Sequence, residues 1–244
     1  MKNSIQFLDI KAAFEKGFKN NGFFRRGDEL FLIDLSGENF AGMRDKGFFE
    51  GVSQVHCIIT HTHGDHVGGI GDLALYSFFT MAPGFSKKLK VYAPTPILDD
   101  VKNLLRIFGT NDMHSDVIGL DLRKATNIGG VEFEPFLVEH VEWLKCFAFE
   151  IRFEDNFIYY SGDSNMIPEV VVEKQLKGEY TEFYQDTCIA DYPGNVHLHL
   201  NLLEGLIPDG SRDNVFVMHL DNGFPLEKAG KLGFKLPKLS GMDY

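Results

Sequence analysis

Residues 54–69 read QVHCIITHTHGDHVGG, an apolar run that passes directly into a cluster of histidine and aspartate. The first seven residues, Gln54 to Thr60, are mostly apolar or β-branched, which predicts a buried strand. His61 and His63 follow the end of this strand two residues apart, so both side chains can project to the same side. The strand is therefore predicted to deliver a pair of imidazoles at its carboxyl end.

The residues that follow extend this cluster. Gly64 is expected to let the backbone turn sharply, which would aim Asp65 and His66 at a second position beside the first. Gly68 and Gly69 are expected to let the chain pack closely as it enters the next helix. Because imidazole and carboxylate suit zinc and related divalent ions, this one loop is predicted to supply ligands to two ions. A histidine-rich surface loop would not need this order of residues after a buried strand.

Three later residues stand just past predicted strands, where layered α/β proteins build their sites. His140 follows the strand Val131–Val138, Asp163 follows Phe157–Tyr160, and His219 follows Val215–Met218. A single histidine or aspartate in a loop is usually solvated or caps a helix. Together with the cluster at 61–66, however, these three are predicted to complete the two metal positions.

The rest of the chain alternates strand and helix signals without a repeat or a linker, which favours a layered α/β fold in one domain over residues 1–244. Further strands are predicted at 5–10, 29–35, 90–93, 146–153, 157–161, 181–189 and 214–218, and helices at 69–81, 95–109, 168–177 and 195–206.

Composition limits the partners. The formal net charge is −11 over 244 residues, which argues against a long polyanion such as tRNA but leaves a small phosphate ester open, because metals can neutralise its charge locally. There is no apolar run long enough for a membrane span and no signal-peptide pattern at the start, so we expect a cytoplasmic location. The three cysteines are widely scattered and predict neither a disulfide framework nor a cysteine zinc site.

The order of these motifs resembles the metallo-β-lactamase superfamily. HTHGDH with a following Gly-Gly pair, a lone histidine, a Gly-Asp pair after a strand and a last histidine span about Asp34 to His219. The resemblance implies a four-layer αββα sandwich with the metals at one edge between the sheets. It assigns His61, His63 and His140 to the first metal and Asp65, His66 and His219 to the second, with Asp163 bridging them.

Residues 183–200 are similar to the ribonuclease Z-like phosphodiesterase branch of that superfamily, and most of all to its small phage and bacterial enzymes that hydrolyse cyclic nucleotides in defence signalling. Phe183–Cys188 matches a strand that ends in an acidic residue, and Asn195–Leu200 matches a segment in which a catalytic histidine opens a helix. The resemblance makes His197 the general acid and Asp186 the carboxylate that orients it, while Asp65 would orient the nucleophile. A capping or solvated His197 is the alternative.

The implied activity is hydrolysis of a small phosphodiester, such as a cyclic nucleotide, by a metal-bridged hydroxide. Zinc is the first choice of metal, manganese is the alternative, and relatives of this branch are commonly homodimers. Two other activities stay open: tRNA 3′ processing as in ribonuclease Z, and lactone or β-lactam hydrolysis. The chain lacks the Gly/Pro-rich basic arm with which ribonuclease Z grips tRNA, and lactonases do not need an acid near residue 197.

Overall fold

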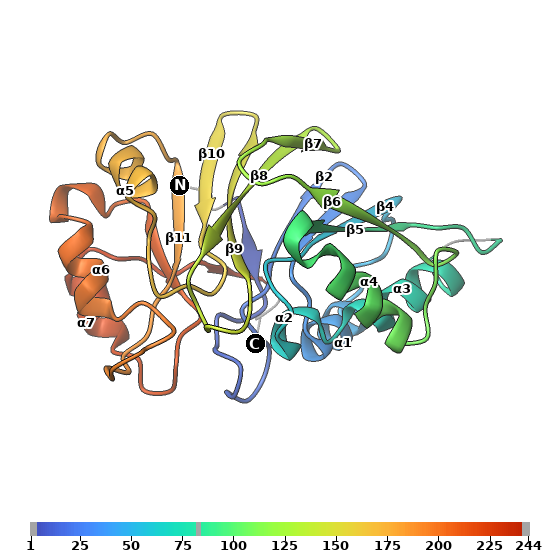
Figure 1. Cartoon of the computed structure of the whole chain (residues 1–244), viewed down its shortest axis with the longest axis horizontal. Helices are drawn as coiled ribbons and strands as arrows, with labels where there is room; N and C mark the ends of the chain where they lie inside the picture. The colour runs from blue at the N-terminus through green and yellow to red at the C-terminus, as the bar shows by residue number, and fades with distance from the viewer. Residues whose placement is uncertain (1–3, 82–83, 241–244) are drawn as a thin grey trace.

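The computed structural model describes residues 4–81 and 84–240, which form two stacked β-sheets with helices on their outer faces (Figure 1). The first sheet has the strand order β13-β1-β2-β3-β4-β5-β6. Its strands are β1 (Gln6–Phe7), β2 (Gly22–Arg26), β3 (Glu29–Ile33), β4 (Gln54–Ile58), β5 (Leu89–Pro94), β6 (Ser115–Leu120) and β13 (Lys238–Leu239). Strands β3 to β6 run parallel, so their carboxyl ends meet at one edge.

The second sheet has the order β12-β11-β10-β9-β8-β7. It consists of β7 (Thr126–Ile128), β8 (Val131–Val138), β9 (Cys146–Phe153), β10 (Asn156–Tyr160), β11 (Glu182–Asp186) and β12 (Val215–Met218). Strands β10, β11 and β12 are parallel, so this sheet also gathers several carboxyl ends at one edge.

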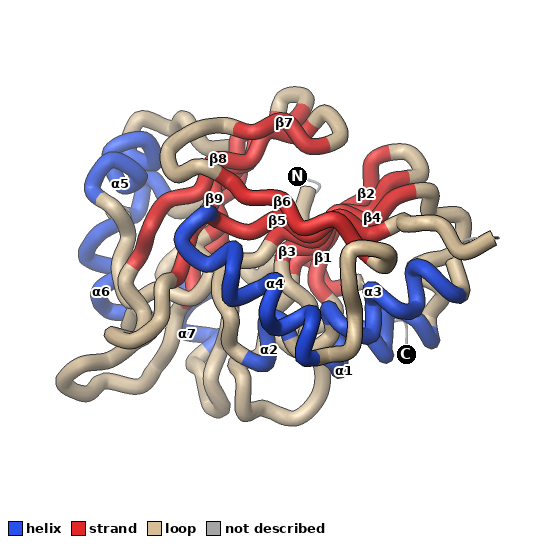
Figure 2. The backbone as a smooth tube through the Cα atoms, turned by 45° about the vertical axis from the view of Figure 1, so that its right-hand side comes forward, coloured by secondary structure: helices blue, strands red, loops and turns tan. Residues whose placement is uncertain are grey.

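Helices cover the outer face of each sheet, as the tube in Figure 2 shows for the first sheet and Figure 1 for the second. Beside the first sheet lie α1 (Gly37–Asp45), α2 (Gly64–Val67), α3 (Ile70–Phe79) and α4 (Leu98–Ile107), and beside the second lie α5 (Glu169–Leu176), α6 (Leu200–Leu206) and α7 (Leu226–Lys231). Short 3₁₀ turns occupy Thr95–Ile97 and Asp209–Ser211. The predicted αββα class is confirmed. Within the described ranges, no helix is long and apolar enough to cross a membrane.

Aromatic side chains fill the space between the two sheets. Phe7 of β1 lies 5.8 Å from Tyr184 of β11, and Phe24 of β2 stacks on Phe153 of β9 at 5.0 Å between ring centroids. Such rings bury a large apolar area, which fixes one sheet on the other. The two edges where strands end are therefore held together.

Several predicted boundaries are wrong. The first strand is only Gln6–Phe7 rather than 5–10, the strand expected over 181–189 is only Glu182–Asp186, and the helix expected from Asn195 begins at Leu200. Strands β2, β6 and β7 and helices α1 and α7 were not predicted. They are short, and β6 is half exposed at the end of its sheet, so their sequences carry little hydrophobic periodicity.

Candidate metal centre

The loop after β4 brings four polar side chains to the edge of the first sheet. The Nε2 atom of buried His61 lies 3.1 Å from Nδ1 of His63, so the two imidazoles do lie on the same side. Helix α2 begins at once, with His63 as its N-cap, and this single turn carries Asp65 and His66 back toward the same edge. The prediction for Gly64 is wrong: its φ lies outside the left-handed region and a Cβ there would meet nothing.

Gly68 and Gly69 do allow the close packing that was predicted. A Cβ at Gly68 would lie 2.5 Å from the carbonyl oxygen of Gly64, and one at Gly69 would lie 2.4 Å from that of Ser36. The segment that follows β3 therefore lies directly against the loop after β4. This contact places Asp34, the residue that follows β3, behind the histidine cluster.

The second sheet contributes His140, Asp163 and His219 from the ends of three strands. Asp163 follows Gly162, whose φ is +58° and whose added Cβ would lie 2.7 Å from the carbonyl oxygen of Phe147. His219 itself has a φ of 56°, which is uncommon for any residue but glycine. Such strain is found where the surrounding structure fixes a side chain for function.

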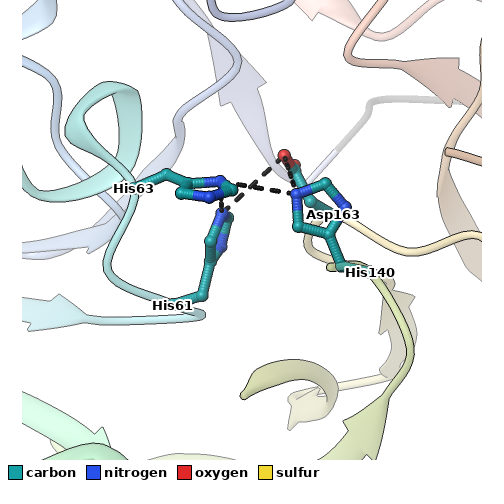
Figure 3. Close-up of side chains that lie close together, drawn as sticks. All are labelled: His61, His63, His140 and Asp163. Atoms are coloured by element: carbon teal, nitrogen blue, oxygen red, sulfur yellow. Dashed lines mark hydrogen bonds and ion pairs between the residues drawn. The ribbon is translucent and has the colours of Figure 1, made fainter. Parts of the chain in front are cut away.

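One group of ligand-type side chains consists of His61, His63, His140 and Asp163, and we call it position one (Figure 3). Their ligand atoms all lie within 4.8 Å of one another. Oδ2 of Asp163 is 3.8 Å from Nε2 of His61 and also 3.8 Å from Nε2 of His140. Three imidazoles and one carboxylate converge on one point, which is the donor set of a zinc site.

A second group consists of Asp65, His66, Asp163 and His219, and we call it position two. Nε2 of His66 lies 3.2 Å from Oδ2 of Asp65 and 3.4 Å from Oδ1 of Asp163, while Nε2 of His219 lies 3.3 Å from Oδ2 of Asp163. Among the described residues, Nε2 of His66, Nε2 of His219 and Oδ1 of Asp163 are buried without a hydrogen-bond partner. Buried polar atoms are rarely left unpaired, so a cation fits here as their missing partner.

Asp34 and Thr60 support both groups from behind. Oδ2 of Asp34 lies 2.8 Å from Nδ1 of His66 and accepts a 2.6 Å hydrogen bond from the Thr60 hydroxyl, whose oxygen lies 3.0 Å from Nδ1 of His61. A carboxylate behind a histidine fixes the tautomer and aims the other ring nitrogen at a metal. The prediction did not give Asp34 a role, although its place after a strand parallel to β4 could have indicated one.

His197 and Asp186 lie next to position two. Nδ1 of His197 is 2.6 Å from Oδ2 of Asp186, which also accepts a 2.8 Å hydrogen bond from the backbone N–H of Ser164. The other oxygen of Asp186 lies 3.6 Å from Nδ1 of His219. Burial opposes the charged imidazolium, but the Asp186 carboxylate outweighs it and raises the pKa of His197 above its ordinary value. One buried carboxylate thus orients both histidines.

The local backbone around His197 is not the predicted helix. Leu198 accepts a hydrogen bond from the N–H of Cys188, and the N–H of Leu200 donates to the carbonyl of Cys188. These two bonds pair His199 with Cys188 in an isolated bridge, and His197 lies in a bend before α6. The nearby histidine His199 caps α6, with Nδ1 accepting from the Asn201 N–H.

Neighbouring carboxylates and imidazoles shift one another's pKa values within the two metal positions. Burial raises the energy of a charged carboxylate, yet the imidazoles of His219 and His66 lower the pKa of Asp163 well below its usual range. Burial likewise opposes a charged His219, but the carboxylates of Asp163 and Asp186 bring its pKa to about 10. In position one, burial and then the neighbouring His66 lower the pKa of His61 well below its ordinary value. Without a metal, Asp163 is therefore anionic, His61 is neutral and His219 is protonated, so a cation that binds His219 would displace its proton.

Two other histidines, His56 and His114, lie outside the metal positions. His56 is buried in β4, with Nδ1 3.1 Å from the Tyr92 hydroxyl and its ring stacked on Phe31, and His114 packs against Phe78. Both make structural contacts away from the metal positions. A cavity of about 460 Å³ opens over both metal positions, and its walls also include Ala13, Phe14, Lys19, Glu38, Val141 and Val196.

Comparison with known proteins extends this picture. A family model described as "Anti-Pycsar protein Apyc1" matches residues 3–236. The Anti-Pycsar protein Apyc1 of Bacillus phage BSP38 is 28% identical over 255 residues, which cover 95% of each chain. Ribonuclease Z of Methanocaldococcus jannaschii is 38% identical over 107 residues, but these cover only 41% of this chain and 31% of that enzyme.

Among solved structures, the metallo-β-lactamase fold protein YhfI from Bacillus subtilis aligns with a TM-score of 0.75 and 16% identity, covering 96% of this chain and 95% of that one. This likeness shows the fold, and the predicted superfamily is confirmed. The fold and the two His/Asp groups together identify the chain as a metal-dependent hydrolase.

Proposed function

The chain belongs to the Anti-Pycsar protein Apyc1 family, and from that premise we propose that it is a binuclear phosphodiesterase that hydrolyses cyclic nucleotides. The observation that carries the proposal is the position of Asp163. This buried carboxylate lies between the two groups: Oδ2 faces His61 and His140 of position one and His219 of position two, and Oδ1 faces His66 of position two. A carboxylate so placed can be shared by two cations.

We assign His61, His63 and His140 to the first ion, Asp65, His66 and His219 to the second, and Asp163 to both. Two bound divalent ions would lower the pKa of water toward neutrality and stabilise charge that develops on the phosphodiester oxygens. Asp65 also faces the cavity, where its second oxygen can orient the attacking water. The buried carboxylates of Asp34 and Asp186 hold His66 and His197 in fixed orientations through hydrogen bonds, so the site needs little rearrangement for reaction.

His197 is the proposed general acid. It lines the cavity above the metal positions, and Asp186 holds its Nδ1 at 2.6 Å, so Nε2 is the free ring nitrogen for the substrate. Proton transfer to the departing oxygen matters most when the leaving alkoxide is a strong base. His197→Ala should therefore lower kcat on a cyclic nucleotide about a hundredfold or more but have much less effect on a nitrophenyl ester.

The control for this test is His199→Asn, which keeps a side-chain acceptor at the N-cap of α6. It should retain nearly full activity on both esters. Equal losses for the His197 and His199 variants, or full activity of His197→Ala on a poor leaving group, would remove His197 from the mechanism.

The proposed activity is tested with purified chain on a panel of 2′,3′- and 3′,5′-cyclic nucleotides, a tRNA precursor, nitrocefin and a lactone. We expect turnover of cyclic nucleotides that is abolished by His63→Ala. Cleavage of the tRNA precursor alone, or of nitrocefin or the lactone without any phosphodiester, would contradict the proposal. The acidic balance of −11 and the partial match to ribonuclease Z make tRNA processing the weaker candidate.

Three further features belong to the same proposal. Zinc suits the three-histidine set of position one, and manganese is the alternative where carboxylates dominate. Because both sheets supply ligands, we propose that residues 1–244 act as one domain. From the resemblance we also expect a homodimer, which light scattering after gel filtration would reveal, and a cytoplasmic location.

A further inference from the structure

Phe14 is a fully exposed aromatic side chain on the wall of the metal cavity. Its relative exposure is 102%, and no ring or cation–π contact involves it among the described residues. Burying a phenylalanine side chain stabilises a fold, so an exposed Phe14 beside a polar site gives up stability. Its near neighbour Phe18, in contrast, packs against the core and lies over Gly42.

The loop that carries Phe14 is fixed to the backbone of one predicted metal ligand and to that of the residue next to another. On one side, the Ala12 N–H donates to the carbonyl of Leu220, the residue after His219. On the other side, the Asn21 side chain donates to the carbonyl of Asp65. The loop is therefore anchored on both sides of position two, and Phe14 stands at its turn, where the Glu15 N–H bonds to Ala12.

The wall around Phe14 is suited to an aromatic ligand with an anionic group. The other apolar residues on the cavity wall are small, namely Ala13, Val141 and Val196, so Phe14 offers the only large flat apolar surface among the lining residues. Lys19 of the same loop and Glu38 also line the cavity with opposite charges, and Nζ of Lys19 donates to the carbonyl oxygen of Glu15. The cavity thus combines a π-face with a metal-binding floor.

The other exposed aromatics of the first half do not reach this cavity. Phe79 and Phe85 contact each other and lie with Phe78 against His114, outside the metal site. They do not line the cavity over the metal positions. They therefore serve as a reference for what an exposed phenylalanine does elsewhere on this protein.

We propose that Phe14 is the stacking surface for the nucleobase of the substrate, while the phosphodiester lies over the metal positions. This inference rests on the proposed cyclic-nucleotide activity and adds the place of the base. Stacking on an aromatic ring is tolerant of base identity because every base has a π-face. Phe14 therefore contributes to KM for purine and pyrimidine substrates alike and does not choose between them.

The test compares KM and kcat for Phe14→Ala, Phe14→Leu and Phe14→Trp with the unchanged chain. Substrates are 3′,5′-cyclic nucleotides and a methyl riboside 3′,5′-cyclic phosphate, which has the same ring but no base. We expect Phe14→Ala to raise KM for cyclic nucleotides about fivefold to a hundredfold, with kcat changed little. KM for the baseless substrate should stay within about twofold, since no stacking is lost.

Three variants serve as controls. Phe14→Leu keeps an apolar side chain without a π-face and should behave like Phe14→Ala, whereas Phe14→Trp should restore the low KM. Phe85→Ala, an exposed phenylalanine outside the cavity, should leave both KM values unchanged.

Each other outcome overturns the inference. If the unchanged chain hydrolyses cyclic nucleotides and Phe14→Ala has the same KM, the base lies elsewhere and the proposed function stands. If Phe14→Ala instead converts a dimer to a monomer and affects baseless and base-containing substrates equally, a second copy of the chain covers Phe14. If the unchanged chain hydrolyses no cyclic nucleotide, the proposed function fails, and this inference fails with it.

Discussion

The two metal positions differ in what stands behind their ligands. In position one, the outer ring nitrogens meet neutral groups: Nδ1 of His61 lies by the Thr60 hydroxyl, and Nδ1 of His140 lies 2.8 Å from the carbonyl oxygen of Val196. In position two, the corresponding nitrogens of His66 and His219 face carboxylates. Similar ligand sets are thus held in environments of different charge.

The carboxylates behind position two are those of Asp34 and Asp186, both buried. A buried anion behind a histidine raises the basicity of that ligand and strengthens its bond to a cation. Position two also contains the carboxylate of Asp65 in addition to that of Asp163. We therefore expect it to hold an oxygen-preferring ion such as manganese more readily than position one does.

The largest effect is expected from Asp163→Asn, because this change removes the charge that both positions share. Loss of metal-assisted stabilisation is worth several kcal/mol, so kcat/KM should fall about a thousandfold or more. Elemental analysis of the purified variant should show that both ions are lost together. A variant that keeps one ion and more than a tenth of its activity would show that the positions are independent.

Smaller losses of metal affinity are expected from changes behind the ligands, and these losses should differ between the two positions. Asp34→Asn weakens the partner of His66, and such outer changes commonly cost about tenfold to a hundredfold in metal affinity or activity. Thr60→Val removes only a hydroxyl behind His61 and should cost less. Competition with a fluorescent chelator would measure both affinities, and equal losses would mean that the charge behind position two has no special effect.

The smallest effect is expected from a change at His56. This buried histidine of β4 lies outside both metal positions. Burial lowers its pKa, partly opposed by the Glu29 carboxylate and assisted by Lys90. At low pH the unfolded chain therefore binds a proton at His56 more readily than the folded chain. The free energy of unfolding is unaffected above the ordinary pKa of histidine and declines as the pH falls below that pKa.

His56→Gln should reduce the acid-induced loss of unfolding free energy by about 1 kcal/mol or less. Activity at neutral pH should be unchanged. Urea unfolding of both metal-free proteins at pH 7 and pH 5 would give the difference directly. A variant whose stability falls with acid as steeply as that of the unchanged chain would remove His56 as the cause.

The sequence predicted the ligand-type residues of the site but not the carboxylate of Asp34 behind them. His61 to His66 are contiguous, so the spacing of one loop indicated a metal cluster before any fold was known. His140, Asp163 and His219 were found because each follows an apolar strand. Asp34 was missed as a partner of His66 because their contact depends on the packing of Gly68 and Gly69 against the segment after β3.

Boundaries failed where tertiary pairing overrides local signals. The sequence around His197 reads as the start of a helix, but His199 forms a bridge with Cys188 and the helix begins only at Leu200. Phe14 carries no sequence signal either, because its loop reaches the site through tertiary contacts such as those with Leu220 and Asp65. Such contacts arise from the folded chain and leave no periodic pattern.

The central claim is that Asp163 lies between two cations. A crystal of the unchanged chain grown with manganese or zinc, measured on both sides of the metal absorption edge, tests it most directly. We predict two anomalous peaks per chain, one among His61, His63 and His140 and one among Asp65, His66 and His219, each in contact with a different oxygen of Asp163. A single peak, or two peaks that Asp163 does not join, would contradict the account.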